Sequence, residues 1–489
     1  MALNQYLHGT YGAFSPSIGA VPVKSGTVAV YVGTAPVNLV RGYADKGVVN
    51  EPVKISNLSD AQNTLGYSDD WNTFTLCEAI KAHFDNSLGN VGPVVFINVL
   101  NPAAHKKSGS QSNVTFANGQ AIIVSDKIIL DTLVLTGKTE GKDYQMHYDY
   151  NLKRVVLTSD TLDGEVAITY SEVDTSNIDE TTIIGKATNT GEFEGLGAVN
   201  MIYTKLNMIP NILAAPGWSD KKEVYAAMLK TATKINGHWE AFVNADMNVT
   251  DVTQVDTIEK AIKWAADNGY KDEKSKVYWP QWKADSGEIY HLSTLATWGM
   301  MKTDQENGDV PMESVSNKQI PFGKLYFGED SKNKGYDQQT ANELNKKGIT
   351  TATFWGGINV LWGPHTAAYD YDGITDNRAI FENSIRTMMH IINSFQAEWG
   401  TVIDEPMTLS LAETIRNREQ EKVDGLKAMG ALIGDPVVEF IETENPIDNL
   451  VQGDFVWSSR ITATPPFKSG TMKVAYTTDG FNAYYGGEA

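Results

Sequence analysis

The spacing of hydrophobic positions predicts a chain whose architecture changes along its length. Residues 27–102 and 208–366 alternate short β-branched runs, typical of buried strands, with amphipathic helices. The predicted strands are Thr27–Val32, Val53–Ile55, Pro93–Val99, Asn211–Gly217, Trp239–Ala245, Lys276–Trp282, Ile349–Trp355 and Ile358–Trp362. The predicted helices are Ser59 (or Asp60)–Gly66, Asn72–Asn86, Ser219 (or Asp220)–Lys234, Thr250–Asn268, Ser293–Lys302 and Thr340–Lys347. Such alternation predicts a parallel or mixed sheet with flanking helices.

A different pattern interrupts this alternation after Asn101-Pro102. Residues 105–112 are polar and are expected to form a loop. Short β patterns separated by Asn-Gly and Asp-Gly turns then follow. They are Val114–Ala117, Ala121–Val124, Thr132–Leu135, Tyr144–Tyr148, Arg154–Thr158 and Val166–Tyr170. Residues 103–190 are therefore predicted to be an inserted all-β sandwich or barrel.

The last part of the chain has the pattern of a packing and assembly module. A long helix is expected at Arg378–Trp399 and a second at Leu409–Ala431. Strand-like runs follow at Val437–Ile441, Phe455–Thr464 and Met472–Tyr476. In the first helix, apolar and small residues recur at three- and four-residue steps and predict one buried stripe, formed by Ile380, Ser384, Met388, Ile391 and Phe395.

The first residues have the pattern of an arm. Glycine and proline interrupt every helix that residues 1–26 could form, yet the segment is rich in apolar side chains, which must be buried on its own domain or on a neighbour. The whole chain is thus predicted to be a multidomain α/β (mixed α+β) protein. Its parts are the arm (1–26), the first part of the α/β core (27–102), the insertion (103–190), an α/β middle domain (191–366) and a C-terminal domain (367–489).

Charge and cysteine content narrow the classes of partner. The chain of 489 residues has a formal charge of −20, so nucleic acid and membrane surfaces are poor partners. The single cysteine, Cys77, excludes an internal disulfide and lies in an apolar helical pattern, which indicates a buried thiol rather than a nucleophile. The first residues lack the pattern of a secretion signal, and no long apolar stretch occurs, so we expect assembly in the cytoplasm and no membrane insertion.

Signatures of enzymes and of cofactor sites are incomplete. Gly137-Lys138-Thr139 lacks the upstream glycine of a phosphate loop, and Asp370–Gly373 lacks the acidic residues of a calcium loop, so a turn is expected there. His365 has no acid or nucleophile placed beside it in the sequence, which favours a structural role. The segment Tyr278–Trp282 is either a set of core or interface anchors or a platform for a sugar ring. We therefore expect no catalytic residue, cofactor or metal.

Several short motifs, in this order along the chain, resemble the sheath proteins of contractile phage tails and related contractile particles. They are Gly9–Gly12, Val28–Pro36, Ile55–Ala61, Val94–Val99, Leu344–Ile349, Leu361–Thr366, Asn377-Arg378 and Ala428–Leu432. Two positions depart from the family pattern: arginine is common where this chain has His365, and an aromatic-plus-proline segment is common where it has Glu313–Gln319. The insertion carries no resemblance.

The resemblance implies a core domain built from both chain ends, stacked in rings around a tail tube. It implies that the polymer shortens when triggered and drives the tube through a host envelope, and that the N-terminal arm and a C-terminal strand (Thr471–Thr477) pair with neighbouring copies. The residues expected in this exchange are Tyr6, Tyr11, Phe14, Ile18, Met472, Val474 and Tyr476. The implied partners are other copies, the tail tube protein, and baseplate and tail terminator proteins. The implied location is the tail of a virion or of a phage-tail-like particle.

The basic residues of the second C-terminal helix leave two interpretations open. Arg416, Arg418, Lys422 and Lys427 alternate with acidic residues, which is typical of a solvated helix but would also suit a releasable contact with the tube. The alternative for the whole chain is a carbohydrate-active enzyme or binding protein of a phage particle, suggested by the aromatic content and the β insertion. A tail tube protein is disfavoured because tube subunits are typically smaller and mostly β.

Overall fold

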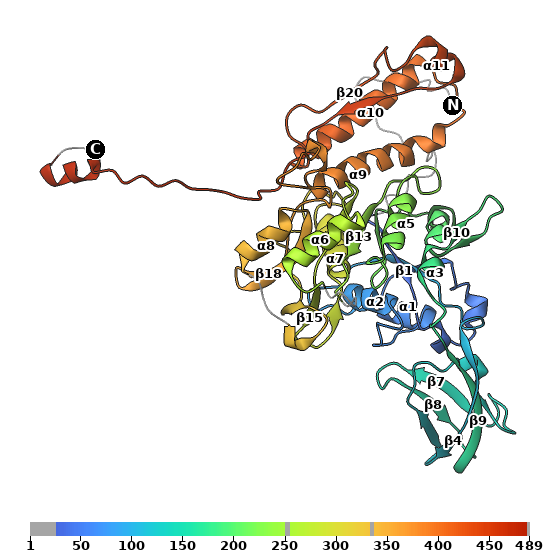
Figure 1. The fold of residues 1–489 in the computed structure, drawn as a ribbon. Helices are drawn as coiled ribbons and strands as arrows, with labels where there is room; N and C mark the ends of the chain where they lie inside the picture. The colour runs from blue at the N-terminus through green and yellow to red at the C-terminus, as the bar shows by residue number, and fades with distance from the viewer. Residues whose placement is uncertain (1–25, 250–254, 333–336, 487–489) are drawn as a thin grey trace, which may run out of the picture.

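A mixed eight-stranded sheet forms the centre of the computed structural model, which describes residues 26–249, 255–332 and 337–486 (Figure 1). The strand order is β19–β18–β14–β13–β12–β1–β3–β2. The strands are β1 (Ala29–Gly33), β2 (Pro52–Ile55), β3 (Val94–Asn98), β12 (Ile212–Ala214), β13 (Phe242–Asp246), β14 (Ser275–Tyr278), β18 (Ile349–Trp355) and β19 (Ile358–Trp362). The six central strands are parallel, and β2 and β19 are antiparallel at the two edges. The predicted α/β core is confirmed.

The first strand of the chain lies in the middle of the sheet. β1 pairs with β12 on one side and with β3 on the other, and all its residues are buried. A continuous β-branched run is what such a position requires, because both faces of the strand are covered by helices. The predicted strand Lys276–Trp282 is divided: the chain leaves the large sheet at Trp279-Pro280, where proline has no N–H for a ladder hydrogen bond.

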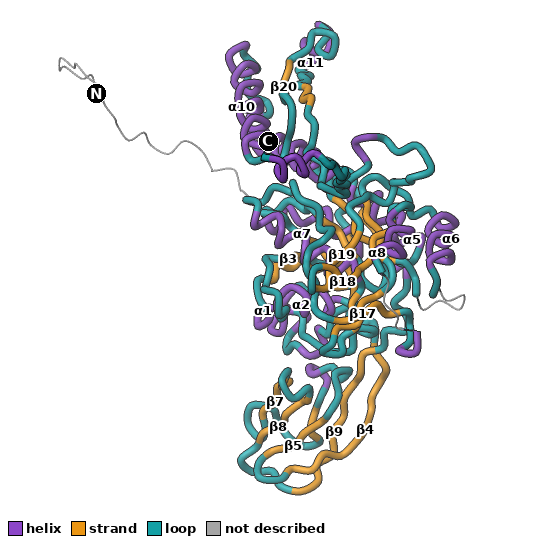
Figure 2. Tube along the Cα trace, turned by 90° about the vertical axis from the view of Figure 1, so that its left-hand side faces the viewer, coloured by secondary structure: helices purple, strands orange, loops and turns teal. Residues whose placement is uncertain are grey.

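Helices cover both faces of the sheet (Figure 2). α2 (Leu76–Phe84) and α7 (Leu292–Glu306) pack on each other and on the central strands, and α5 (Lys222–Ala232) and α6 (Ile258–Asn268) lie on the other side. Shorter helices are α1 (Leu58–Thr64), α3 (Glu180–Ile184), α4 (Ile202–Leu206) and α8 (Gln338–Asn345). Of these, α1 and α8 were predicted, whereas α3 and α4 were not, and α3 lies within residues 103–190, which were expected to be all-β.

Several helix starts differ from the prediction: α2 begins at Leu76 instead of Asn72, the long C-terminal helix begins at Glu382 instead of Arg378, and two other helices differ in their caps. α1 is capped by Asn57, whose side chain accepts the Asp60 N–H at 2.9 Å, rather than by Ser59 or Asp60. α5 begins after Lys221 without a side-chain cap. The expected cap, Ser219, is fully buried, and its Oγ accepts the backbone N–H of Asp246 at 2.9 Å. A tertiary hydrogen bond from the sheet therefore replaces the local one.

The insertion is a sandwich of two three-stranded sheets, β4–β9–β6 and β5–β8–β7. Its strands are β4 (Lys106–Phe116), β5 (Gln120–Ile123), β6 (Val134–Leu135), β7 (Gln145–Asp149), β8 (Arg154–Thr158) and β9 (Gly164–Val173). The expected loop at residues 105–112 is wrong, because β4 begins at Lys106 and pairs with β9. β4 is an edge strand, where polar side chains are common, so the absence of apolar alternation hid it. After β9, Ile178 and Ile183 pack into the core of the large sheet.

Two smaller sheets flank the core. β15 (Gln281–Ala284) pairs with β16 (Ile289–Tyr290) and β17 (Gly323–Tyr326), and β10 (Lys186–Ala187) pairs with β11 (Phe193–Glu194). Tyr278, Trp279 and Trp282 are buried at this junction. The core-anchor interpretation is therefore confirmed, and the sugar platform is wrong because the ring faces are not accessible.

The C-terminal elements form a layer at the end of the molecule opposite the sandwich (Figure 1). They are α9 (Glu382–Trp399), α10 (Leu409–Ala428), β20 (Val437–Glu439), α11 (Ile447–Gln452) and β21 (Ser458–Arg460). A separate small core holds the layer together, formed by Val310, Val423, Leu426, Ala431, Leu432 and Val438.

The predicted stripe on α9 is only partly correct. Of its members only Ser384 is buried, and Ile391 and Phe395 are half-buried against the C-terminal layer. The face that packs on the large core contains Glu382 and Arg386, which are 0% and 3% exposed. The helix is therefore anchored by buried charges, which a search for apolar spacing does not detect.

Candidate functional site

α9 is fastened to the core by a buried ion pair. Lys276 of β14 pairs with Glu382, and both side chains are fully buried. The Lys276 ammonium also donates to the carbonyl oxygens of Gly363 (2.6 Å) and His365 (3.1 Å), and a Glu382 oxygen accepts the Val315 N–H at 2.7 Å. Burial lowers the pKa of Lys276, and the Glu382 carboxylate opposes that shift. A buried charge is tolerated only when it is paired and hydrogen-bonded in this way.

The same helix holds the points where both ends of the chain leave the body. Arg386 pairs with Asp304 of α7, and the Thr27 hydroxyl donates to the same Asp304 carboxylate at 2.7 Å. Three residues earlier, the Asn383 side-chain amide donates to the carbonyl oxygen of Thr464 at 3.0 Å. Thr27 is the start of the sheet and Thr464 precedes the C-terminal extension, so α9 anchors the root of each.

The C-terminal extension crosses solvent instead of folding back (Figure 1). The expected strand Met472–Tyr476 has no ladder partner in the part of the chain that the structure describes, and Met472, Val474 and Tyr476 are 80–86% exposed. Phe481, Tyr484 and Tyr485 beyond it are also exposed. The four N-terminal residues expected in strand exchange, Tyr6, Tyr11, Phe14 and Ile18, lie outside the described residues.

A small two-stranded sheet next to α10, referred to below as the hairpin although α11 lies between its strands, has its outer edge on β21, because the Val438 N–H of β20 donates to the Gln420 side chain at 2.8 Å. β20 and β21 form a two-stranded antiparallel sheet with three residue pairs. Phe440, Phe455 and Trp457 form an aromatic cluster beside it. The predicted runs Val437–Ile441 and Phe455–Thr464 are confirmed only in these short strands. A hairpin of this size is marginal alone, and an added strand would complete it.

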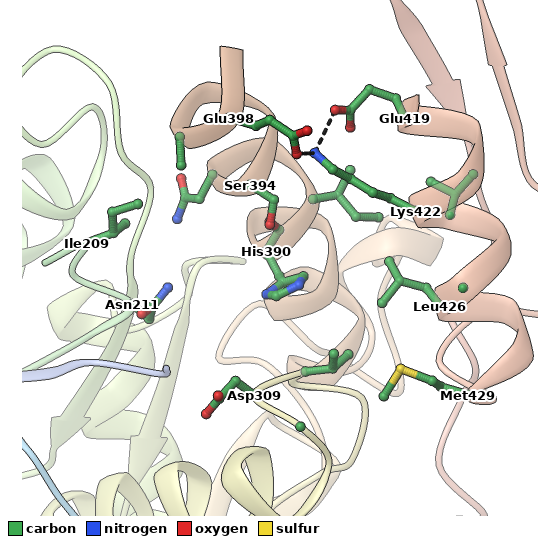
Figure 3. Close-up of a pocket in the computed structure, with 17 residues that line it drawn as sticks. Ile209, Asn211, Asp309, His390, Ser394, Glu398, Glu419, Lys422, Leu426 and Met429 are labelled. Carbon is green, nitrogen blue, oxygen red and sulfur yellow. Dashed lines mark hydrogen bonds and ion pairs between the residues drawn. The ribbon is translucent and has the colours of Figure 1, made fainter. Parts of the chain in front are cut away.

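A groove of about 400 Å³ separates α9 from α10 (Figure 3). Asp309 and Met429 lie at one end and Glu398 and Glu419 at the other. The lining between them includes Ile391, Val423 and Leu426. The α10 side of the groove is therefore largely apolar, whereas α9 also contributes the polar side chains of His390, Asn393 and Ser394.

The whole chain is similar to tail sheath proteins in sequence and to contractile sheaths in fold. No family model matches. The tail sheath protein of Burkholderia phage BcepMu is 26% identical over 98% of both chains, and that of Escherichia phage P2 is 25% identical over 60% of this chain and 70% of its own. Among solved structures, the contracted sheath complex of the extracellular contractile injection system PVC matches 97% of this chain with a TM-score of 0.56 and 12% identity. The contracted helical sheath of the anti-feeding prophage matches 97% with a TM-score of 0.54 and 13% identity.

Over nearly its whole length the chain is similar to contractile tail sheath proteins. The similarity covers the sheath protein of the Burkholderia phage almost from end to end, with the insertion included in the aligned length. The two structural matches agree with this family in fold.

The four basic residues of α10, Arg416, Arg418, Lys422 and Lys427, do not form one surface. Arg418 pairs with Glu398 of α9 at 2.5 Å, and Lys422 pairs with the same carboxylate at 2.6 Å, at the end of the groove (Figure 3). Burial raises the pKa of Glu398, but Lys422 and Arg418 outweigh it and hold that pKa below its usual value. Arg416 and Lys427, three turns apart and exposed, share another side of the helix.

Within the described part of the chain, Arg416 and Lys427 make local contacts, with the same helix and with the loop that follows it. Arg416 donates to Asn417, and Lys427 pairs with Asp435 at 2.9 Å. Both pairs are exposed, so they add little stability and can be exchanged for contacts with another protein. A tube contact through this side of α10 stays a prediction.

The crevice where an α/β enzyme would place its site is filled with structural groups in this chain. Between the carboxyl ends of β1 and β12 the strand order reverses, which is the usual ligand position in such sheets. Beside it, Glu78 accepts the backbone N–H of His291 (2.6 Å) and contacts its Nδ1 (2.7 Å), and Asp246 accepts the Ser293 N–H at the start of α7. Burial lowers the pKa of His291, but Glu78 and nearby carboxylates outweigh it and raise that pKa to about 9. These groups fix α7 against α2.

Other candidate groups are structural as well. Cys77 is buried, and burial raises the pKa of its thiol. His365 stacks between Tyr369 and Phe381, and burial lowers its pKa to about 3. Asp370 and Asp372 both pair with Lys347 across a turn, as expected for that segment.

The described residues contain neither a cluster of metal-ligating side chains nor a helix that could span a membrane. No group of three or more His, Cys, Asp or Glu side chains is arranged to hold a metal ion in that part of the chain. Within the same ranges, no helix has both the length and the hydropathy that a bilayer span needs.

Proposed function

We propose that this chain is the subunit of a contractile tail sheath. Copies polymerise as stacked rings around a tail tube, and the polymer shortens to drive the tube through a host envelope. The observation that carries this proposal is the 26% identity to a tail sheath protein over 98% of both chains. The role is structural and not catalytic. The particle is the tail of a virion or a phage-tail-like machine, and assembly takes place in the host cytoplasm.

Neighbouring copies are joined by exchanged strands. The extension carries Met472, Val474 and Tyr476 at alternate positions, so the three side chains share one face of an extended strand. The β20–β21 hairpin of another copy offers the free edge, and its aromatic cluster offers an apolar surface for that face. Each main-chain hydrogen bond contributes about 0.5–1.5 kcal/mol, so a seven-residue strand stabilises the contact by several kcal/mol. The apolar N-terminal arm makes a second connection of the same kind.

Further partners complete the particle. The tail tube protein lies inside the rings, next to α10, and baseplate and tail terminator proteins lie at the two ends of the polymer. A structure of baseplate from the anti-feeding prophage also contains a chain of this fold, with a TM-score of 0.55 and 13% identity. A carbohydrate-active role has no supporting observation, since Tyr278, Trp279 and Trp282 of the segment considered as a sugar platform are buried.

Replacing Val474 with proline tests the strand exchange. Proline removes the N–H and cannot occupy a paired strand, while the side chain stays apolar. Since Val474 is 80% exposed in the single chain, the monomer should melt within about 1 °C of the wild type. Negative-stain microscopy should show tubes or rings for the wild type and for the control Val474→Ile, and discrete particles for Val474→Pro. Normal tubes from the proline variant would refute strand exchange, and a wild type that forms only discrete particles would refute the sheath assignment.

A further inference from the structure

The chain enters the described fold at the mouth of the α9–α10 groove. The backbone N–H of Val28 donates to the Asn211 side chain at 2.9 Å. At Gly26, a Cβ atom would lie 2.7 Å from the Asp309 carboxylate. Asn211 and Asp309 both line the groove. Residues that precede Gly26 therefore begin at the Asp309 end of this groove.

A buried cation with unused donors lies at the same place. Arg386 is 3% exposed, and its Nε and Nη1 atoms have no hydrogen-bond partner among the described residues. Together with Thr27 and Asp309 it lines a pocket of about 30 Å³ at the mouth of the groove. Buried guanidinium donors are normally satisfied, so this position lacks an acceptor such as a main-chain carbonyl oxygen.

The dimensions of the groove match a short extended segment. On α10 the lining runs from Met429 to Glu419, and on α9 from His390 to Glu398. At 1.5 Å per residue these are about 15 Å and 12 Å. An extended chain advances about 3.3 Å per residue, so the five steps from Gly26 to Val21 span about 17 Å.

The sequence before Gly26 has a suitable apolar face. Val21 and Val23 flank Pro22, and residues two apart point to the same side of an extended chain. The residue before a proline is biased toward extended backbone, and proline fixes its own φ near the same region. The segment therefore loses little conformational freedom when it is held extended.

We propose that the groove between α9 and α10 is the binding site for the chain's own residues 20–25. Val21 and Val23 lie against Ile391, Val423 and Leu426, and a carbonyl oxygen next to Gly26 accepts from Arg386. Residues 20–25 are thus held on their own subunit, where they run along α9. Only the residues before it, with Tyr6, Tyr11, Phe14 and Ile18, remain to reach another copy.

Crosslinking between residue 21 and α9 tests this assignment in the full-length monomer. In a Cys77→Ala background, Val21→Cys is combined with Ser394→Cys, which lines the middle of the groove (Figure 3), and treated with a short bismaleimide. We expect an intrachain link in most molecules, seen as a joined tryptic peptide. Val21→Cys combined with Val124→Cys, an exposed position in the sandwich, is the matched control and should give no link. Absence of the 21–394 link in soluble, monomeric protein would refute the proposal.

A mixture of single variants separates the chain's own segment from that of another copy. Molecules with only Val21→Cys are mixed with molecules with only Ser394→Cys, and they should give no crosslinked dimer. Dimers from this mixture would show that the segment of a second copy occupies the groove, which overturns the proposal without touching the sheath assignment. Neither result depends on polymerisation, so the outcome is independent of the microscopy of tubes.

Hydrogen exchange gives a second measurement that does not need engineered cysteines. Val21→Asp replaces an apolar side chain of the segment with a charged one, whose loss of hydration in the groove should expel the segment. Amides of α9 and α10 that face the groove should then exchange about tenfold faster, whereas those of the sandwich should not change. Unchanged exchange in α9 and α10 would count against occupancy of the groove by residues 20–25.

Discussion

Individual buried charges determine how the C-terminal half of the molecule is attached. Glu382 and Arg386 are one turn apart on α9 and point into the core, where each meets an opposite charge from the α/β domain. A buried ion pair adds little over an apolar contact of the same shape, but removing one partner is costly because the other stays buried and charged. The pairs therefore specify the position of α9 more than they stabilise it.

Changing Lys276 to methionine should test this at the residue scale. Methionine has nearly the length of lysine, so the main loss is the positive charge beside Glu382. We expect a decrease of about 3–5 kcal/mol in the free energy of unfolding, measured with urea. The double variant Lys276→Met with Glu382→Leu should recover most of it. The exposed pair Lys263–Asp267 provides the control, since Lys263→Met should cost under about 0.5 kcal/mol.

A loss of less than 1 kcal/mol for Lys276→Met would contradict the interpretation. It would mean that Glu382 takes up a proton or reaches water in the variant. A double variant no better than Lys276→Met would assign the loss to packing instead of charge.

Neither pair was predicted from the sequence, for a physical reason. Lys276 and Glu382 are 106 positions apart, and Asp304 and Arg386 are 82 apart. Local periodicity detects the side of a helix that is apolar, and on α9 it found Ile391 and Phe395, which face the small C-terminal layer. A charged residue that is buried because of a distant partner carries no local signal. The same limit applies to Ser219, which forms a distant hydrogen bond instead of the expected cap.

At the scale of elements, most strand predictions depended on the strand being buried on both faces of its sheet, and these predictions were reliable. The strands of the large sheet and the apolar strands of the insertion are confirmed. The predictions failed for elements that are held mainly by pairing with another strand. One is the polar edge strand β4. The other is the run Met472–Tyr476, which has no partner in the described part of a single chain. The alternation in that run predicts a strand only when a second copy supplies the neighbouring one.

α10 allows an element-scale test of tube contact, because its basic residues separate into two sides. Arg416→Glu with Lys427→Glu changes the exposed side, and we expect several-fold weaker co-assembly with the tail tube protein and a melting temperature within about 2 °C of the wild type. Arg418→Glu with Lys422→Glu changes the side that faces Glu398. This pair of changes should instead weaken the α9–α10 junction and lower the melting temperature by several degrees.

Sedimentation of mixed sheath and tube proteins, with calorimetry of the sheath protein alone, would distinguish the two double variants. Co-assembly of Arg416→Glu with Lys427→Glu at the wild-type level would remove the proposed tube contact. The exposed charges of α10 would then be those of a solvated helix.

For the molecule as a whole, the sandwich and the C-terminal layer lie at opposite ends of the α/β core (Figure 1). The sandwich is entered and left through adjacent strands, since Lys106 pairs with Val173. Its contacts with the core are largely polar, such as those of Asn38 with the carbonyl oxygens of Asp126 and Ile128. Apolar contacts also cross the boundary: Leu39 packs in the core of the sandwich, and Ile129 and Val173 of the insertion pack in the core of the large sheet.

Replacing residues 106–173 with a short Gly-Ser linker should therefore leave the rest of the protein folded. We expect a cooperative thermal transition a few degrees lower, because Leu39 becomes exposed, and we expect tubes to form as before. Circular dichroism and negative-stain microscopy are the measurements. Loss of cooperative unfolding would show that the sandwich is an integral part of the core, and folded protein without tubes would assign the sandwich a role in assembly.

The attachment of Thr27 and Thr464 to neighbouring turns of α9 has a mechanical consequence. Arg386 and Asn383 are three positions apart, or about 4.5 Å along the helix axis. Tension applied between the two ends of one subunit would pass through this single turn, by way of Asp304 on one side. The eight-stranded sheet and the sandwich would then lie beside the loaded path and bear little of the tension.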